Sequence, residues 1–321
     1  MKIAIQNPTT MTLVEKIAAL GEEVTVVGPR GDMAHLWDSF NARIAEWNRM
    51  GLKVKWLETP FYKIDYKPYD LLIHSTETFG YAKEWVKYYS KATIPTVLKT
   101  CWGKVPTNYL PHAYLQQMLE RPVILEMPSH LEDWKGAGFT DVTALPNPVG
   151  DWWFEREWTG SMDTVLFVLA GRHKWRLKDE TLLGLDWWER LCRIFPEHCH
   201  HHDGYNAYLT PIQMAEMFAC SRVFVNLDTP FGEGERPLAL AFTEALAAGM
   251  PVVARDLPGL DYKKFGAVIN GFEELVEFVR TCLKDQEFAS ACSEINRETA
   301  WNNFSTRVLK PEYEAVFGRA K

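Results

Sequence analysis

The chain has 321 residues, 47% of them hydrophobic, which is enough to bury more than one core, so two domains are expected. A formal net charge of −7 argues against a broad nucleic-acid-binding surface. The six cysteines form no C-x-x-C pair, and no apolar run approaches the roughly 18 residues needed to cross a bilayer. Because MKIAIQ opens directly in a strand pattern, we expect a cytoplasmic protein with no signal peptide and no integral membrane association.

Short apolar runs alternate with amphipathic stretches along the first half of the chain. Gly21 ends the first predicted helix, and Gly28-Pro29 ends the second predicted strand. Strands are predicted at 2–6, 23–29, 52–58, 69–75, 94–100, 121–129 and 141–147, and helices at 12–21, 33–50, 80–91 and 109–119. This alternation predicts a parallel, doubly wound sheet with helices on both faces.

The rhythm breaks at 147–160, where proline, glycine and aromatic residues predict a connector between two domains. It then restarts with predicted strands at 162–171, 199–203, 222–228, 251–255 and 267–270, and helices at 179–195, 211–221 and 272–285 before a helical C-terminal region. Two such α/β units facing a central cleft would bind a ligand at the carboxyl ends of their strands.

One segment, ERPLALAFTEALAAGMPVVARD, combines a short helix, a glycine stop and an immediate apolar strand with a single acid, Glu244, inside the helix. It resembles the donor-binding segment of family 4 retaining glycosyltransferases, which have two Rossmann-like domains (the GT-B fold). The positions that match the pattern of that family are Pro237, Leu240, Glu244, Ala245, Gly249, Pro251, Val252, Val253 and Ala254.

Further stretches resemble the family in the same order along the chain. They are 139–151 (the interdomain hinge), 165–172 (the first donor-domain strand), 213–228 (the helix and strand before the donor loop) and 303–317 (the last helices). The resemblance implies an acceptor domain at 1–150, a donor domain at 151–302 and a C-terminal helix at 303–321 that packs back on the N-terminal domain.

The resemblance also implies a nucleotide-sugar co-substrate, a UDP-sugar being favoured, and no tightly bound cofactor. Glu244 would accept hydrogen bonds from both ribose hydroxyls, and Leu240 belongs to the same segment. The alternatives for Glu244 are a cap on a neighbouring helix and an ion pair with Arg236 or Arg255. The diphosphate would be held by Arg172, which follows Gly171 at a strand end, and by Lys178, with Arg176 as its substitute. The alternative for this basic run is a solvated loop.

In retaining transfer by this family, the leaving phosphate takes the proton of the acceptor, and the protein supplies positioning and charge stabilisation. Arg172 and Lys178 are the candidates for that electrostatic role. The sugar-binding glutamate of the family falls at Arg236 in this chain, and a one-residue shift would bring Glu235 into its place. Arg236 would instead bind the donor through its diphosphate or through an acidic sugar. This departure leaves a second reading open, a sugar-nucleotide-binding protein of the same fold without transferase activity.

On the acceptor side, Cys101 stands where the family often has a histidine, and Trp102 follows it. The other candidates there are Asn7, Thr10, His74 and Glu77. For His74 the alternative is a structural residue at a strand end. The acceptor is left open among a soluble glycan, a small molecule and a modified base in DNA. The sequence gives no indication of the oligomeric state.

Two other patterns are weaker. The histidines of CHHHD lack the H-E-x-x-H spacing, so no metal site is predicted, and HDGYNAYLT (202–210) is favoured as a base-contacting loop. The tryptophans are taken mainly as core residues, with Trp102 and Trp175 the best candidates for stacking on a sugar. A dinucleotide-dependent oxidoreductase is disfavoured because QNPTTM occupies the place of G-x-G-x-x-G.

Overall fold

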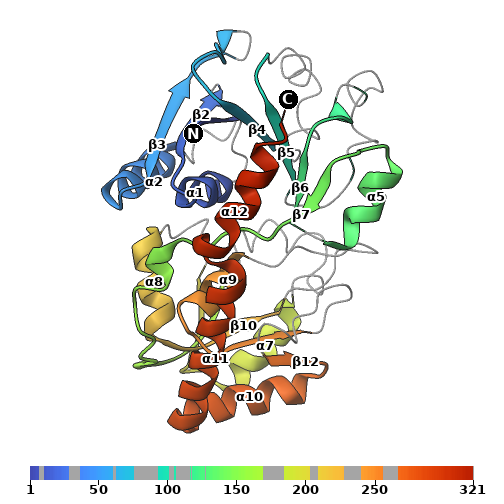
Figure 1. The fold of residues 1–321 in the computed structure, drawn as a ribbon. Helices are drawn as coiled ribbons and strands as arrows, with labels where there is room; N and C mark the ends of the chain where they lie inside the picture. The colour runs from blue at the N-terminus through green and yellow to red at the C-terminus, as the bar shows by residue number, and fades with distance from the viewer. Residues whose placement is uncertain are drawn as a thin grey trace. The chain divides into compact units, whose positions relative to one another are not determined.

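The structure, a computed structural model, describes residues 1–6, 11–28, 37–60, 63–75, 93–100, 105, 116, 118–126, 128–168, 184–202, 209–227, 240–255 and 267–320 (Figure 1). The chain divides into two compact α/β units. Unit 1 comprises Met1–Pro148 and Thr306–Lys321, and unit 2 comprises Val149–Ser305. Each unit contains one parallel sheet.

The sheet of unit 1 has seven strands in the order β3-β2-β1-β4-β5-β6-β7. The strands are β1 (Lys2–Gln6), β2 (Glu23–Gly28), β3 (Lys53–Glu58), β4 (Leu71–Ser75), β5 (Thr96–Thr100), β6 (Val123–Leu125) and β7 (Val142–Ala144). Every neighbouring pair is parallel, and β1 and β4 are in direct register. The order therefore reverses direction between β1 and β4, which makes this the topological switch point of the sheet.

Both faces of the central strands of this sheet are covered, because their residues are apolar on each side, whereas the edge strand β3 exposes Lys53 and Lys55. The helices of one face are α1 (Met11–Ala19), α2 (Trp37–Arg49) and α12 (Thr306–Phe317), which pack on Ile3, Ile5 and Ile73. On the other face Ala4, Val27 and Leu72 pack against Ile64, Tyr66 and Tyr69. Further along that face, α5 (Leu131–Gly136) places Trp134 over Leu98 and Val123, and the 3-10 turn η5 (Pro128–His130) leads into it.

Unit 2 holds a five-stranded parallel sheet in the order β12-β11-β10-β8-β9. Its strands are β8 (Met162–Val168), β9 (Cys199–His202), β10 (Ser221–Asn226), β11 (Val252–Arg255) and β12 (Ala267–Ile269). Counted from β8, the order reads 2-1-3-4-5, so the switch point of this sheet lies between β8 and β10.

The helices of unit 2 are divided between the two faces of its sheet. The helices are α7 (Leu185–Ile194), α8 (Pro211–Cys220), α9 (Leu240–Ala247), α10 (Phe272–Lys284) and α11 (Gln286–Phe304). Leu166, Phe224 and Ala254 face α8, α9 and the end of α11, whereas Val165, Val225 and Val253 face α7 and α10. Successive residues of each strand therefore face opposite sides of the sheet.

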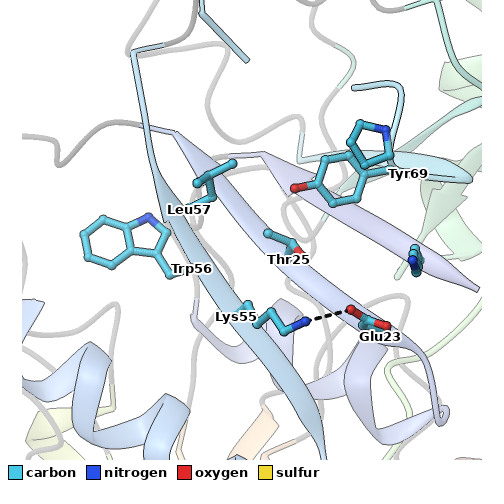
Figure 2. A pocket seen from close by; sticks show the side chains of 8 residues that line it. Glu23, Thr25, Lys55, Trp56, Leu57 and Tyr69 are labelled. Carbon is cyan, nitrogen blue, oxygen red and sulfur yellow. Dashed lines mark hydrogen bonds and ion pairs between the residues drawn. The ribbon is translucent and has the colours of Figure 1, made fainter. Parts of the chain in front are cut away.

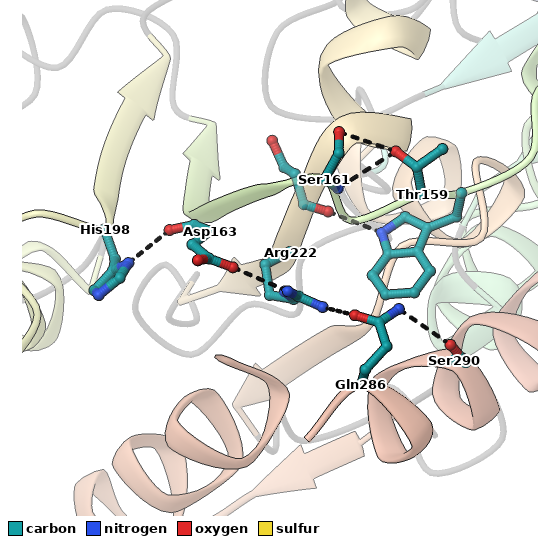
Figure 3. A network of polar contacts seen from close by, with 9 residues as sticks. Thr159, Ser161, Asp163, His198, Arg222, Gln286 and Ser290 are labelled. Atoms are coloured by element: carbon teal, nitrogen blue, oxygen red, sulfur yellow. Dashed lines mark hydrogen bonds and ion pairs between the residues drawn. The ribbon is translucent and has the colours of Figure 1, made fainter. Parts of the chain in front are cut away.

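A polar network ties the amino ends of β8 and β10 to α11 (Figure 3). The Arg222 guanidinium donates to Asp163 Oδ1 at 2.9 Å and also to Gln286, while Gln286 Nε2 donates to Ser290 Oγ at 3.3 Å. The Trp158 indole donates to the backbone carbonyl of Ser221 at 2.8 Å. These contacts lie at the amino edge of the sheet, so they secure the unit without occupying its carboxyl edge.

All twelve strands predicted from the sequence are present, although β6, β7 and β12 are only three residues long, and α1, α2, α7, α8 and α9 lie between strands as expected. The helix predicted at 80–91 and most of the helix predicted at 109–119 lie outside the described residues. The boundary between the units, at Pro148 and Val149, falls inside the predicted connector 147–160, and the chain returns to unit 1 at Ser305 and Thr306. Most of the predicted connector belongs to unit 2, whose core begins with the 3-10 turn η6 (Asp151–Trp153). Trp153 and Phe154 are buried there because large aromatic side chains contribute more to a core than to a linker. Within the described helices, none has the length and apolar character needed to cross a membrane.

Candidate functional site at the carboxyl edges of the two sheets

In doubly wound sheets, ligands bind outside the carboxyl ends of the strands at the switch point. For unit 2 this position is the end of β10, beside β8. The segment that resembles a donor-binding motif lies directly next to it, because β11 pairs with β10 through Val225↔Val253 and Asn226↔Ala254. The sequence motif and the topological switch point therefore indicate the same edge.

Close packing fixes the helix–turn–strand unit made by α9 and β11. Ala245, Leu246 and Ala247 are fully buried, and the chain reverses at Gly249, whose φ of +74° favours glycine. The buried Asn296 of α11 donates its Nδ2 to the Met250 carbonyl at 2.8 Å. The alanines thus let α9 lie close to the sheet, and the hydrogen bond from Asn296 of α11 stabilises the turn that follows α9.

Glu244 lies on α9, half-buried between neighbours that are fully enclosed. A crossover helix runs antiparallel to the strands it connects, so α9 begins at the carboxyl edge of the sheet. Leu240 is its first residue. Arg255, one of the alternative partners considered for Glu244, instead lies over the Trp187 ring at 4.0 Å, on the opposite face of the sheet.

Asn226, a residue that the sequence analysis did not select, ends β10. Its side chain is 5% exposed, and within the described part of the chain its Nδ2 has no hydrogen-bond partner. Alternation places it on the same face as Phe224, toward α8 and α9. The only signal in the sequence is a polar residue that ends the apolar run RVFV.

The opposite face of this edge is closed by Gly184, at the start of α7. Its φ is +67°, and a Cβ atom built on it would lie 2.0 Å from the carbonyl oxygen of Leu227, the residue after β10. Only glycine permits this approach. The start of α7 therefore presses directly on the end of β10.

In unit 1, Gln6 and His74 are paired across the switch point between β1 and β4. Gln6 is 1% exposed and donates its Nε2 to Tyr66 Oη at 2.9 Å, while no described residue donates to its Oε1. Burial raises the pKa of Tyr66, so the phenol stays protonated. The sequence analysis selected the next residue, Asn7, and missed Gln6.

His74 is 1% exposed, and burial, assisted by the nearby charge of Arg121, lowers its pKa to about 3. The imidazole is therefore neutral near pH 7, which fits a hydrogen-bonding role and not that of a proton donor. A buried, neutral imidazole agrees with the structural alternative given for His74.

A buried ion pair that the sequence did not suggest lies on the other face of the same sheet. Lys99 Nζ is 3.0 Å from Glu126 Oε1, and the two side chains are 0% and 6% exposed. The two residues become neighbours only through the pairing of β5 with β6. Breaking such a pair leaves an uncompensated buried charge, so it is a structural constraint at this edge.

The remaining site residues predicted from the sequence lie outside the described residues: Asn7, Thr10, Glu77, Cys101, Trp102, Gly171, Arg172, Arg176, Lys178, Glu235 and Arg236. Two other patterns fall only partly on described residues, because 203–208 and Trp175 lie outside them. His198 contacts the Asp163 carbonyl at 2.7 Å and His201 packs on Phe167, and among the described residues no three metal-ligating side chains cluster. Trp153 and Trp188 are core residues.

Two hollows lined by described residues lie away from the switch points. The hollow in unit 1 has a volume of about 300 Å³ and is lined by Tyr69 and Thr25 (Figure 2). The ion pair between Lys55 and Glu23 lies beside it and lowers the pKa of Glu23. Lys2 and Glu23 begin their strands, so this hollow lies toward the amino edge. The other, about 540 Å³, lies beside Trp301 of α11.

Solved structures share this arrangement of elements over their full length. HepE from Anabaena, solved with UDP and glucose, aligns over 99% of both chains with a TM-score of 0.63 and 12% identity. Sucrose-phosphate synthase from Thermosynechococcus elongatus aligns over 99% of this chain and 98% of its own, with a TM-score of 0.57 and 14% identity. AviGT4, a glycosyltransferase involved in avilamycin A biosynthesis, aligns over 100% and 98%, with a TM-score of 0.59 and 12% identity.

The chain has the GT-B fold. The fold class expected from the sequence is thereby confirmed. No protein-family profile and no curated protein sequence matches the chain. Identities of 12–14% establish the GT-B architecture alone, so membership of family 4 stays a prediction.

Proposed function

We propose that the chain is a retaining glycosyltransferase that moves a sugar from a nucleotide-sugar donor, with a UDP-sugar favoured, to a hydroxyl group of an acceptor. The observation that carries this proposal is the placement of the donor-like segment: α9, the Gly249 turn and β11 lie next to the switch point of unit 2. HepE, which is similar along its whole length, was solved with UDP and with UDP-glucose. Its ligand class is the one we extend to this chain.

In this proposal unit 2 binds the nucleotide, with Glu244 accepting hydrogen bonds from the ribose diol. The bond between the anomeric carbon and the leaving phosphate oxygen breaks while a bond to the acceptor oxygen forms on the same face. The acceptor proton passes to the leaving phosphate. Arg172 and Lys178, with Glu235 near the sugar, would stabilise and position the reacting groups.

The acceptor is assigned to unit 1, at the switch point formed by Gln6 and His74. The Oε1 of Gln6 is a buried acceptor that a ligand hydroxyl can satisfy, and His74 offers a neutral imidazole beside it. Hydroxyl-bearing glycans and small molecules fit these groups, and a modified base in DNA fits if its hydroxyl reaches them.

The test is a thermal-shift screen against UDP-, GDP-, ADP- and TDP-sugars, followed by detection of nucleoside diphosphate release with a panel of hydroxyl acceptors. Stabilisation by one nucleotide class together with a glycosylated product of retained anomeric configuration supports the proposal. Binding without transfer or hydrolysis would favour the non-catalytic sugar-nucleotide-binding protein, to which the arginine at position 236 points. No binding of any nucleotide sugar would reject both.

Glu244→Gln is the residue-level test of the donor assignment. We expect nucleotide affinity to weaken by about 1–3 kcal/mol, because the charge-assisted contact with the ribose diol is lost. Isothermal titration calorimetry with the nucleoside diphosphate measures the change. Glu273→Gln, at an exposed glutamate in the first turn of α10, is the control and should bind like the wild type. Unchanged affinity in Glu244→Gln would remove this residue from the site.

A further inference from the structure

We infer that Asn226 is a donor-binding residue whose side-chain N–H donates to a diphosphate oxygen of the nucleotide. This inference rests on the proposed function and adds to it a contact from the end of β10. It starts from an imbalance in the structure: a carboxamide that is only 5% exposed carries an Nδ2 with no hydrogen-bond partner within the described part of the chain.

Other carboxamides of the protein have a partner for this atom, which sets Asn226 apart. Asn48 donates its Nδ2 to the Val54 carbonyl at 2.9 Å and accepts from the Val54 amide at 3.0 Å. Asn296 donates to the Met250 carbonyl. These two side chains each stabilise the fold through a bond within their own unit. The Nδ2 of Asn226 makes no such bond to a described residue, and a buried N–H without a partner costs stability in the absence of a ligand.

The position of Asn226 is the one where a ligand is expected. It is the last residue of β10, one of the two strands that border the switch point of unit 2. Its Cα partner on β11 is Ala254, which is fully buried and carries no polar side-chain atom. The neighbouring strand therefore offers the carboxamide no side-chain acceptor, and a ligand at the carboxyl edge can supply one.

The chemistry of the edge favours an anionic oxygen. The orphaned atom is a donor, so its partner must supply a lone pair. Asn226 lies on the same face as α9, and α9 begins at this edge, so the positive end of its helix dipole is added to the same region. Of the groups in a nucleotide sugar, the diphosphate carries the negative charge and the largest number of acceptor oxygens. The geometry thus points to the diphosphate.

The experiment compares Asn226→Leu and Asn226→Asp with the wild-type chain, using UDP and uridine as probes, or the diphosphate and nucleoside of whichever base the wild type binds. Leucine keeps the branched shape of the side chain and removes the unpaired polar atom, and aspartate replaces the N–H with an anionic oxygen. Asn48→Leu is the control, because it removes a carboxamide whose bonds are satisfied, at a more exposed position than Asn226. Unfolding temperature without ligand and dissociation constants by calorimetry are the two readouts.

We expect Asn226→Leu to raise the unfolding temperature of the free protein by about 2–4 °C, because an unsatisfied buried group is removed. The same variant should bind UDP about tenfold more weakly and uridine as the wild type does. Asn226→Asp should lose more UDP affinity than Asn226→Leu, because like charges then meet. Asn48→Leu should lower the unfolding temperature and leave UDP affinity unchanged.

Three results would overturn the inference while leaving the proposed function intact. They are wild-type UDP affinity in both Asn226 variants, an equal loss for UDP and uridine, and a fall in unfolding temperature like that of Asn48→Leu without loss of UDP binding. A wild-type chain that binds no nucleoside diphosphate would reject the proposed function and this contact together.

Discussion

Burial at the end of β4 determines the protonation state of His74. Its pKa is near 6.5 in an unfolded chain and is lowered to about 3 in the fold, so between these values only the unfolded chain takes up the proton. The contribution of His74 is therefore fully present above pH 6.5 and is lost as the pH falls toward 3. The limiting slope is about 1.4 kcal/mol per pH unit.

We expect His74→Gln, which is neutral at every pH, to remove this acid sensitivity. The free energy of unfolding in urea should fall between pH 6.5 and pH 5 by about 2 kcal/mol less in the variant than in the wild type. His200→Gln, at an exposed histidine of β9, should retain the wild-type difference. If His74→Gln and the wild type lose stability in parallel, the buried neutral imidazole is disproved.

Gly184 offers a second test at the scale of one residue. In Gly184→Ala the new Cβ would combine left-handed strain with a clash against the Leu227 carbonyl oxygen, whereas a Cβ added to Gly51, with its φ of +89°, would meet no atom within 4 Å. Gly51→Ala should therefore cost about 1–2 kcal/mol for strain alone. Gly184→Ala should cost at least about 2 kcal/mol more, because the end of β10 must shift. Equal losses in urea unfolding would contradict the close contact.

At the scale of elements, the unit formed by α9, its turn and β11 depends on α11. Asn296→Ala removes the donor to the buried Met250 carbonyl, and we expect a loss of about 1–3 kcal/mol in the free energy of unfolding. Asn303→Ala is the control, because the exposed Asn303 side chain bonds only the Thr299 carbonyl of its own helix. This variant should change the free energy of unfolding by less than about 0.5 kcal/mol. Similar values for the two variants would show that α11 does not hold the turn.

The same elements show how far the sequence leads. The twelve strands were predictable because each is an apolar run between helical stretches, and the α9–β11 segment was predictable because a helix, a glycine and a strand follow one another closely. The burial of Trp153 and Phe154 in a core was not predictable, because a stretch of proline, glycine and aromatic residues has the composition of a linker. Their place in the core is evident only from the ring contacts of Trp153 with Phe218 and of Phe154 with Trp301.

Sequence reasoning selected Glu244 and His74 as candidate site residues. Glu244 was selected through the resemblance to the donor-binding segment, and His74 was selected as a polar residue at the end of an apolar run. Asn226 and Gln6 have the same signature, but what sets them apart is an unsatisfied atom after burial, and burial depends on the helices and loops that pack over the strand ends. The Lys99–Glu126 pair joins residues 27 apart in the chain, so only the register of β5 and β6 reveals it.

At the scale of the whole molecule, the proposed function assigns the nucleotide to unit 2. Saturating UDP should therefore slow amide hydrogen exchange in the full chain at the end of β10, in α9 and in β11, because binding suppresses local opening there. Amides of α1 and α2 in unit 1 should exchange at their ligand-free rates. Protection confined to unit 1 would contradict the donor assignment.

The two stretches of chain that make up unit 1 have a consequence for synthesis. Leu309 and Tyr313 of α12 belong to the same core as the first strand, while every residue of unit 2 lies in one continuous stretch. A nascent chain that has reached Ser305 already contains all of unit 2 but still lacks a helix of the unit begun first. Unit 1, whose strands precede unit 2 in the chain, is thus completed after unit 2, and its β1–β4 edge stays without full support until α12 has been synthesised.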